Sequence, residues 1–390
     1  MIPSGFDVMV VGLGTVGAAT CMELARRGVS VIGLDAFRPP HRFGSHHGES
    51  RSIRRAYMEG TGYVPLAIRA WELWRRLEKD SGKNLLVTTG NLTLGPRDGK
   101  AVTGFLASAR AHDIAFEDLT AAEIRRRWPQ LVPHNGFAGG LEKEAGVIFP
   151  ETAIDLFLSE AEKAGATLRF NERVDRWRET GDRVTIHTTQ AEYEGGCLLL
   201  TAGARNKRLL KTSGSYLSPK RVPVLWVAPP QLQDYCLGNL PVNFWQLPLS
   251  GDAGDPDCLE LYALPVTRPG GRVKVAAHSH LSDCDPDTMT REIRHGEMAA
   301  IRMFLKEFIP ALAGCDITAD VCLYSMTPDR DFALGQLPGH RNVFTAALAG
   351  HGFKFAPVLG ELLADIALGN SPAFDLSMFA ISRFTNTKIP

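Results

Sequence analysis

A glycine-rich segment near the N-terminus constrains the fold of this chain more than any other feature. The apolar residues 6–11 run into Gly12 to Gly17, with the sequence GLGTVG, and residues 18–26 have the pattern of a helix. A strand, a glycine turn that lets the backbone approach a pyrophosphate, and a helix N-terminus facing the phosphates make a dinucleotide-binding fingerprint. A second apolar run, Val29–Leu34, ends at Asp35, where a carboxylate can bind a ribose. The pattern predicts an adenine dinucleotide, and NAD and FAD fit it equally.

Length and charge limit the classes of protein that remain. The 390 residues exceed the usual size of one domain, and the 44% hydrophobic content is ample for a large core. The 43 Lys and Arg balance 43 Asp and Glu, so no overall field attracts nucleic acid or an anionic membrane. No apolar run reaches the roughly 18 residues of a membrane helix, and neither end resembles a targeting signal. We therefore expect a cytoplasmic protein that binds neither nucleic acid nor membrane.

The cysteines and histidines do not predict a metal site. The seven cysteines are odd in number and far apart, which argues against a disulfide framework and against a CxxC zinc site. His278 and His280 could in principle chelate a metal, but no third ligand stands at a suitable spacing. We expect no bound metal.

Two later segments repeat the strand and turn of the N-terminus. Residues 197–200 are typical of a buried strand and run into Thr201 to Ala204, and residues 342–347 run into Gly350 to Phe355 and a helix. Between them, residues 218–274 show short strand patterns broken by Pro and Gly, which favours an antiparallel sheet. We predict an α/β fold (α+β overall), with a Rossmann-like dinucleotide-binding domain and a second, mostly antiparallel β-sheet substrate domain.

The predicted domains are discontinuous, because the chain returns to the first domain at its end. The dinucleotide-binding domain is expected to comprise residues 1–82, 150–217 and 318–390, and the substrate domain residues 83–149 and 218–317. Other predicted elements are helices over Tyr63–Lys79, Phe105–Ala111, Ala121–Trp128 with Thr120 as N-cap, residues 152–164 and Thr288–Ile309, and strands over Leu85–Leu94, Thr167–Phe170 and Val184–Thr188.

Residues 38–55 are too rich in Gly, Pro and charge to be a core element, and we expect a loop that enters a helix. Their arginines and adjacent histidines would be a solvated charge run in most proteins. Their position favours a ligand site, because a loop after the second strand lies near the carboxyl ends of the strands.

The sequence pattern alone does not decide the role of three further positions. Lys274 shares one face of an apolar strand with Ala276 and His278, so it belongs either to an exposed strand face or to a functional site that calls for a partner. Cys322 lies in an apolar run and is, by pattern, a small core residue. Gly350 to Gly352 precede a helix and Lys354 adds a charge, an arrangement that can hold an anionic group.

Taken in order, these motifs resemble one known family. Gly12 to Gly17 with Asp35, Gly44 to Arg51 (GSHHGESR), Cys322 to Tyr324 (CLY) and Gly350 to Phe355 (GHGFKF) resemble the monomeric sarcosine oxidase and N-methyltryptophan oxidase family, related to D-amino acid oxidase, over essentially the whole chain. The resemblance implies FAD attached covalently through its 8α position, as an 8α-S-cysteinyl link, and Cys322 stands at the anchor position. It also implies a monomer whose partners are a small amino acid and O2.

The same resemblance implies roles for individual residues. Lys274 would lie over the flavin and activate oxygen, and Arg54 and Lys354 would clamp the substrate carboxylate. The other residues implied to line the active site are Arg51, His47, Tyr262, His278 and Tyr324. Together with the fingerprint and the two later turns, the expected cofactor-binding residues are Gly12, Gly14, Thr15, Val16, Gly17, Asp35, Ser45, His46, Arg51, Val174, Ala202, Gly203, Cys322, Gly350, His351, Gly352, Phe353 and Lys354.

The implied activity is an FAD-dependent oxidase of secondary or tertiary amino acids such as sarcosine or N-methyltryptophan, which oxidises a C–N bond to an imine and reduces O2 to H2O2. The chain departs from the family at Glu49-Ser50 and at Arg55, and the segment 234–257, with its Gly251–Asp257 loop, matches no family pattern. The substrate therefore stays open among N-methyl, cyclic (pipecolate-like), saccharopine and fructosyl amino acids. A flavin dehydrogenase with a non-oxygen acceptor and a non-catalytic dinucleotide-binding or redox-sensing protein remain as alternatives.

Overall fold

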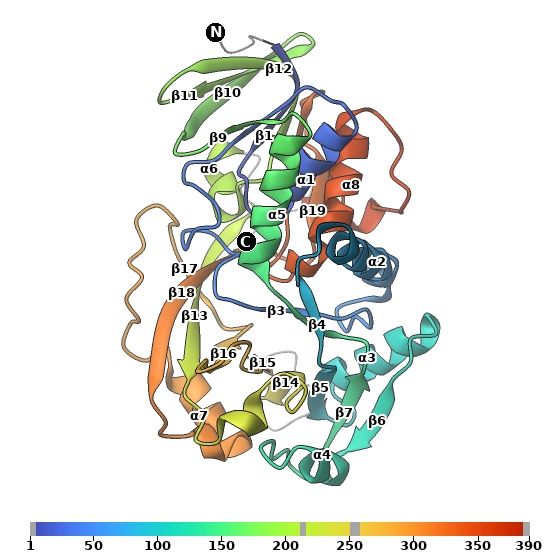
Figure 1. The fold of residues 1–390 in the computed structure, drawn as a ribbon, viewed down its shortest axis with the longest axis vertical. Coiled ribbons are helices and arrows are strands. Elements are labelled where there is room, and N and C mark those ends of the chain that lie inside the picture. Colours follow the sequence, from blue (N-terminus) through green and yellow to red (C-terminus); the bar gives the residue numbers. More distant parts are fainter. Residues whose placement is uncertain (1–4, 211–215, 250–257, 385–390) are drawn as a thin grey trace.

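Two large sheets, one above the other in Figure 1, dominate the computed structural model. The structure describes residues 5–210, 216–249 and 258–384. The prediction for the Gly251–Asp257 loop lies outside these residues.

The first sheet has a parallel centre with antiparallel additions. Its parallel strands are, in order, β9 (Thr167–Arg169), β2 (Val31–Leu34), β1 (Gly5–Val11), β12 (Glu192–Leu200) and β20 (Val343–Ala347). The strand β11 (Arg183–Thr188) pairs antiparallel with the first half of β12, and β10 (Val174–Thr180) pairs antiparallel with β11. On the other side, β19 (Ala333–Gln336) pairs antiparallel with β20. Hydrophobic clusters cover β1 on both faces, which explains why its sequence is a continuous apolar run and not an alternating one.

Helices cover one face of the first sheet. The helix α1 (Thr15–Arg26) packs between α5 (Pro150–Lys163) and α8 (Ala356–Ala367), as Figure 1 shows, and α2 (Val64–Ser81) packs on α8. The buried Trp74 of α2 donates its indole N–H to the carbonyl of Lys354 at 2.7 Å. This bond ties α2 to the turn in front of α8. The short α6 (Asn206–Leu209) follows β12.

The second sheet is mostly antiparallel. Its strand order is β17 (Ser282–Asp283), β13 (Ser218–Val227), β16 (Val273–Ala277), β15 (Cys258–Leu264), β14 (Val242–Pro248), β5 (Asn91–Pro96), β7 (Phe137–Glu142) and β6 (Glu117–Thr120), with β18 (Ile317–Met326) paired along β13. The helices α3 (Lys100–Ala111) and α4 (Ala121–Arg127) pack on the strands β5 to β7. Phe304 and Phe308 of α7 (Ala299–Phe308) contact the ring of Trp245 in β14. A small third sheet joins β3 (Arg51–Ile53), β8 (Gly146–Ile148) and β4 (Leu86–Thr88).

The predicted fold class is confirmed, since parallel and antiparallel sheets occur with helices in one mixed α/β architecture. The capping residue Thr120 is also confirmed, because its side chain accepts the Glu123 N–H while the Glu123 carboxylate accepts the Thr120 N–H. The division into two domains stays a prediction, and its proposed boundary at residue 318 falls inside β18, which pairs with β13 of the second sheet.

Two local predictions differ from the structure, and the strand β10 was missed. Residues 38–55 contain the short strand β3 near their end, where a helix was expected to begin. The expected single strand Leu85–Leu94 is two strands in different sheets, β4 and β5, because the chain turns at residues 89–90. The strand β10 was not predicted at all.

The helix expected over Thr288–Ile309 begins only at Ala299. The carbonyls of Thr290 and Glu292 accept hydrogen bonds from the buried guanidinium of Arg221, at 2.7 and 2.8 Å. A helical stretch would use these carbonyls internally, so the long-range arginine holds the segment in turns. No helix in the part of the chain that the structure describes is both long and apolar enough to cross a membrane.

Candidate active site

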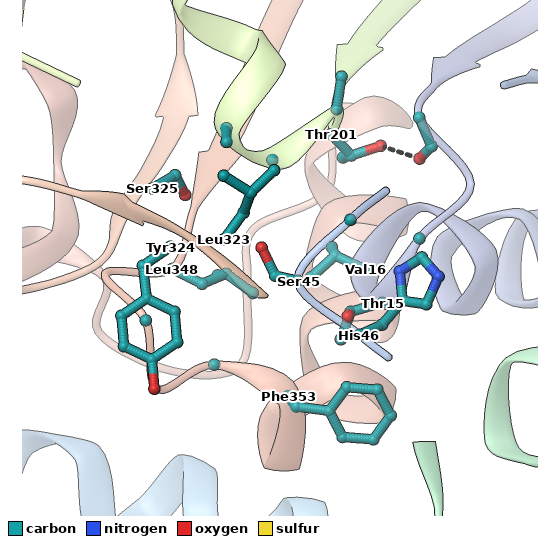
Figure 2. A pocket seen from close by; sticks show the side chains of 18 of the residues that line it. Thr15, Val16, Ser45, His46, Thr201, Leu323, Tyr324, Ser325, Leu348 and Phe353 are labelled. Carbon is teal, nitrogen blue, oxygen red and sulfur yellow. Dashed lines mark hydrogen bonds between the residues drawn. The ribbon is translucent and has the colours of Figure 1, made fainter. Parts of the chain in front are cut away.

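A long cavity lies between the two sheets and takes its walls from both. From the first sheet come the ends of β1, β2 and β20, and from the second come residues of β14, β15, β16 and β18. Figure 2 shows Thr15, Val16 and His46 on one side, Leu323 and Tyr324 on the other, and Ser45 between them.

One end of the cavity is built by the glycine fingerprint. Gly12 has φ +96°, and a Cβ there would lie 2.4 Å from the Cα of Ala202, so the turn needs glycine both for its conformation and for this close approach. Asp35 follows β2, and its carboxylate accepts the N–H groups of Leu13 and Phe37 at 2.8 and 2.9 Å. These bonds fix the acid at the cavity wall beside the turn.

The first turn of α1 has no side-chain cap and no acidic residue. Gly14, Thr15 and Val16 nevertheless line the cavity. The unpaired amides of a helix N-terminus carry partial positive charge, so this end of the cavity suits a phosphate group.

Arg51 lines the cavity and is held by backbone carbonyls. Its Nη2 donates to the carbonyls of Ser45 and His47, both at 2.7 Å, and its Nη1 donates to the carbonyl of Ser50 at 2.7 Å. The Sγ atom of Cys322 lies 3.7 Å from Arg51 Nη2. The guanidinium is therefore a fixed positive charge beside a buried thiol.

Cys322 has an unusually acidic thiol. Burial alone would raise its pKa, but the neighbouring His47, Arg51 and Lys274 side chains lower the pKa to about 7. Its Sγ lies 3.6 Å from the carbonyl of Ser45, which lines the cavity, whereas Cys322 itself does not. A thiol with this pKa is a thiolate for a large part of the time near neutral pH.

Lys274 is a buried lysine, with 2% of its surface exposed. Its Nζ donates to the carbonyls of Gly48 and Ser50 at 2.9 and 2.7 Å. Burial, together with the charge of Arg51, lowers its pKa well below the ordinary value of a lysine. The interpretation of this strand face as exposed is therefore wrong, and Lys274 lines the cavity.

A second buried lysine stands at the other side of the cavity. Lys354 is 5% exposed and precedes α8, and its Nζ donates to the carbonyl of His351 at 2.6 Å and to the hydroxyl of Tyr57 at 3.2 Å. Burial and the charge of Arg54 lower its pKa to about 7, although Glu59 opposes this change. Near neutral pH this lysine is therefore poised to take up a proton when an anion arrives.

Arg54 pairs with a carboxylate. Its Nη2 donates to both oxygens of Glu59, at 2.7 and 3.0 Å, and the guanidinium lies over the ring of Tyr57. Burial would raise the pKa of Glu59, but Arg54, His351 and Lys354 hold it near 2. The Nε of Arg54 is buried and has no hydrogen-bond partner in the described part of the chain. One donor of this arginine is thus left for a ligand.

Aromatic side chains close the space between the two lysines. His278 Nδ1 lies 3.2 Å from the hydroxyl of Tyr324, and its ring stands edge-on to those of Tyr324 and Phe244. Tyr262 lines the same wall and is hydrogen-bonded to Tyr324. Burial lowers the pKa of His278 to about 4, so its imidazole is neutral at pH 7.

The comparison with protein families decides which cofactor this cavity serves. The model of the FAD dependent oxidoreductase family matches residues 7–366. The chain belongs to this family. FAD is therefore the dinucleotide, and the prediction of a flavin-dependent oxidoreductase is confirmed.

Relatives within this FAD-dependent family carry the names that the motifs suggested. The chain is 35% identical to the monomeric sarcosine oxidase of Streptomyces avermitilis over 96% of both chains, and 33% identical to the N-methyl-L-tryptophan oxidase of Salmonella agona over 97% of this chain and 99% of the relative. The predicted resemblance is thus confirmed.

Solved structures agree with the fold. The open form of the Tyr258Phe mutant of NikD, an unusual amino acid oxidase essential for nikkomycin biosynthesis, is 25% identical with a TM-score of 0.82 over 97% of each chain. L-proline dehydrogenase from P. horikoshii has a TM-score of 0.82 over 98% of each chain at 20% identity, which supports the fold alone.

The cavity fits the FAD of this family. The uncapped α1 amides and Asp35 suit the pyrophosphate and ribose of its ADP half, and the cavity continues from there to Lys274 and Tyr324. The predicted site residues that line it are Gly12, Gly14, Thr15, Val16, Asp35, Ser45, His46, Arg51, Arg54, Val174, Ala202, Gly203, Tyr262, Lys274, His278, Tyr324, Gly350, His351, Gly352, Phe353 and Lys354.

Three predicted site residues are not in the cavity lining. His47 and Cys322 lie behind Ser45 and Arg51. Gly17 faces the turn instead, since a Cβ on it would lie 1.9 Å from the Gly12 carbonyl oxygen.

Sequence reasoning also missed residues that line the cavity. Glu59, Asn91 and Phe244 belong to the cavity lining and were not predicted. Glu59 gives no local signal, because its role as partner of Arg54 depends on the fold of the turn between them. Asn91 could have been noticed as an amide beside the apolar residues with which β5 begins, where a buried polar side chain needs a partner.

Proposed function

We propose that the protein is an FAD-dependent oxidase of N-methyl amino acids, which oxidises the C–N bond to an imine and reduces O2 to H2O2. The observation that carries the proposal is the pair of Arg54 and Lys354, two buried cations beside an aromatic wall, with the Arg54 Nε unpaired. The names of the relatives, monomeric sarcosine oxidase and N-methyl-L-tryptophan oxidase, support the substrate class.

The charge balance of this pair favours a carboxylate ligand. When Lys354 is protonated, Arg54 and Lys354 bring two positive charges and Glu59 brings one negative charge. A substrate carboxylate supplies the missing charge in a site from which water is largely excluded, where charge-assisted hydrogen bonds are strong. The amine of the same substrate then lies toward His278, Tyr262 and Tyr324, and the neutral His278 leaves the amine free of a competing positive charge.

Bound FAD supplies the chemistry of a two-electron acceptor that O2 can reoxidise. The residues of this chain hold and orient it. The amides of α1 and Asp35 bind the ADP half, and Lys274 with Arg51 provides positive charge where oxygen becomes negative. A preorganised cation at the place where charge develops lowers a reaction barrier.

Cys322 is the proposed site of covalent attachment, through the 8α position of FAD. Its pKa of about 7 supports the proposal because the thiolate is the reactive form. In acid-precipitated protein the yellow colour is expected to stay with the pellet, and in Cys322→Ser to pass to the supernatant. Colour in the supernatant of the unaltered protein contradicts the link.

An oxygen-coupled assay tests the proposed function. Sarcosine, N-methyltryptophan, pipecolate, proline, saccharopine and a fructosyl amino acid are offered in turn, and O2 uptake and H2O2 are measured. We expect the fastest turnover with an N-methyl amino acid. Turnover with a dye but not with O2 would favour a dehydrogenase, and a cyclic, saccharopine or fructosyl substrate would move the proposal to that class. No turnover of any amine overturns it.

We also propose that the enzyme acts as a monomer in the cytoplasm, with an amino acid and O2 as its partners. The balanced surface charge supports free diffusion without a nucleic-acid or membrane partner. Light scattering on the eluting protein tests the oligomeric state, and a mass of twice 42.6 kDa contradicts a monomer.

A further inference from the structure

Both hydrogen-bond acceptors of Lys274 belong to one tight turn, Gly48 to Ser50. The carbonyls of Gly48 and Ser50 accept from its Nζ, and the N–H of Ser50 also donates to the Gly48 carbonyl at 2.8 Å. Gly48 has φ +106° and Glu49 has φ +69°. A positive φ at a non-glycine residue is strained and persists where surrounding contacts enforce it. The position of the lysine therefore depends on whatever holds this turn.

Glu151 holds the turn from outside. It lies in the first turn of α5, and its Oε1 accepts the N–H groups of Gly48 and Glu49, at 2.8 and 3.1 Å. The side chain of Glu49 points away and pairs with the exposed Arg268 at 2.5 Å, so it does not anchor the turn to the cavity. Glu151 itself is absent from the cavity lining and touches neither lysine.

We propose that Glu151 is a positioning residue for the reaction with oxygen, because it fixes the two amides whose turn presents the Gly48 and Ser50 carbonyls to Lys274. The inference rests on the proposed function, in which Lys274 acts on oxygen. The effect of Glu151 is limited to the reaction with oxygen, since Arg54 and Lys354 donate their hydrogen bonds to Glu59, Tyr57 and His351.

The negative charge of Glu151 adds to its geometric effect. The charged groups that act on Lys274 are Arg51, which disfavours the ammonium, and Cys322, Glu151 and Glu49, which favour it. Loss of the Glu151 charge is expected to lower the pKa of Lys274. The ammonium is the form that assists oxygen. The rate of reoxidation by O2 should therefore begin to fall at a lower pH when the Glu151 charge is lost.

Two substitutions separate geometry from charge. Because one oxygen atom of Glu151 accepts both amides, the amide oxygen of Glu151→Gln can keep both bonds while the charge is lost. Glu151→Ala loses both hydrogen bonds and the charge. Glu78 offers a matched control, since its Oε1 accepts the N–H groups of Leu85 and Leu86, at 3.0 and 2.9 Å, outside the cavity lining.

The test uses the FAD-loaded protein in stopped-flow experiments, in which anaerobic reduction by the amine and reoxidation by O2 are measured separately. For Glu151→Ala we expect reoxidation to slow by about tenfold and reduction to change little, because a small misplacement of an acting group is enough to lose this much rate. For Glu151→Gln we expect a smaller loss at neutral pH and a fall of the reoxidation rate that begins at lower pH than in the unaltered protein.

Amide hydrogen exchange supplies a readout that is independent of turnover and can be made without FAD. Exchange in a peptide containing residues 48–50 should rise in Glu151→Ala and stay low in Glu151→Gln. In Glu78→Ala the rise should be confined to residues 85–86, with both half-reactions unchanged. Equal slowing of reduction and reoxidation in Glu151→Ala, or no slowing of reoxidation in either Glu151 variant, overturns the inference. If the unaltered protein does not react with O2, the proposed function fails instead.

Discussion

The cavity contains two pairs of a lysine and an arginine, and they are held in different ways. Arg54 donates to the side-chain carboxylate of Glu59, and Lys354 donates to the His351 carbonyl and the Tyr57 hydroxyl. Lys274 and Arg51 instead donate to backbone carbonyls of the segment 44–50. A side chain can move aside for a ligand, whereas a backbone carbonyl in the turn that Glu151 holds cannot. Arg54 is thus suited to exchange one carboxylate for another, and Lys274 and Arg51 are suited to stay in place.

The pKa values of both lysines are lowered, so the division rests on their hydrogen bonds and not on their charge. Burial lowers both, but Glu59 opposes the fall at Lys354, whose pKa is about 7, whereas Lys274 is shifted well below its ordinary value. The comparison teaches that Arg54 can change its partner when substrate binds, whereas the hydrogen bonds of Lys274 to the turn hold its Nζ in place. The following experiments test this division.

The largest effect is expected from Lys274→Met, which removes the Nζ donor held by the turn and keeps a similar side-chain volume. Reoxidation by O2 should slow by about 10³-fold, as for the loss of a preorganised donor at a developing charge. Reduction of the flavin by the amine should change far less. Stopped-flow measurement of both half-reactions checks this, and equal slowing of the two contradicts the role of Lys274.

Lys354→Met should instead impair substrate binding and the reduction of the flavin by the amine. Without this cation the substrate carboxylate keeps one partner instead of two, and we expect kcat/KM for the amino acid to fall by about 100-fold, mainly through KM. The rate constant of reoxidation should be unchanged. The corresponding amine without a carboxylate is the control, because its turnover should not depend on Lys354.

The pH dependence of substrate binding should report Lys354. Its pKa in the free protein is about 7, and the ammonium is the form that binds a carboxylate, so kcat/KM should fall by up to tenfold per pH unit as the pH rises above 7. Lys354→Arg keeps the charge and should move this fall to higher pH. A pH profile that is identical in the two proteins contradicts the assignment.

The smallest effect is expected from Glu59→Gln. The substrate carboxylate then no longer competes with Glu59 for Arg54, so KM should fall by about threefold. The loss of the ion pair should also lower thermal stability, since Arg54 is left buried without its partner. Asp80→Asn, on an exposed part of α2, is a control that should change neither quantity. A raised KM in Glu59→Gln contradicts the exchange of carboxylates.

The sequence predicts those parts of the fold that local patterns determine. The strand, turn and helix of residues 6–26 and the N-cap Thr120 follow from spacing and capping chemistry alone. The helix predicted from residue 288 failed because a long-range donor, Arg221, takes the carbonyls that a helix needs. No local pattern contains that information.

The residues of the candidate site also differ in whether a local pattern can predict them. Lys274 and His278 could be placed on one strand face by period two, and both line the cavity. Glu59 and Glu151 could not be assigned, because each acts through a hydrogen bond to a group that only the folded chain brings near. Glu151 lies about a hundred positions after the turn that it holds.

A crystal structure of the FAD-loaded protein with acetate, a carboxylate that has no amine to oxidise, tests the division between the two cation pairs most directly. We predict acetate on Arg54 and Lys354, with Glu59 displaced from Arg54, and Lys274 still bonded to the carbonyls of Gly48 and Ser50. Acetate bound to Lys274 and Arg51, with the Arg54–Glu59 pair intact, would contradict this division.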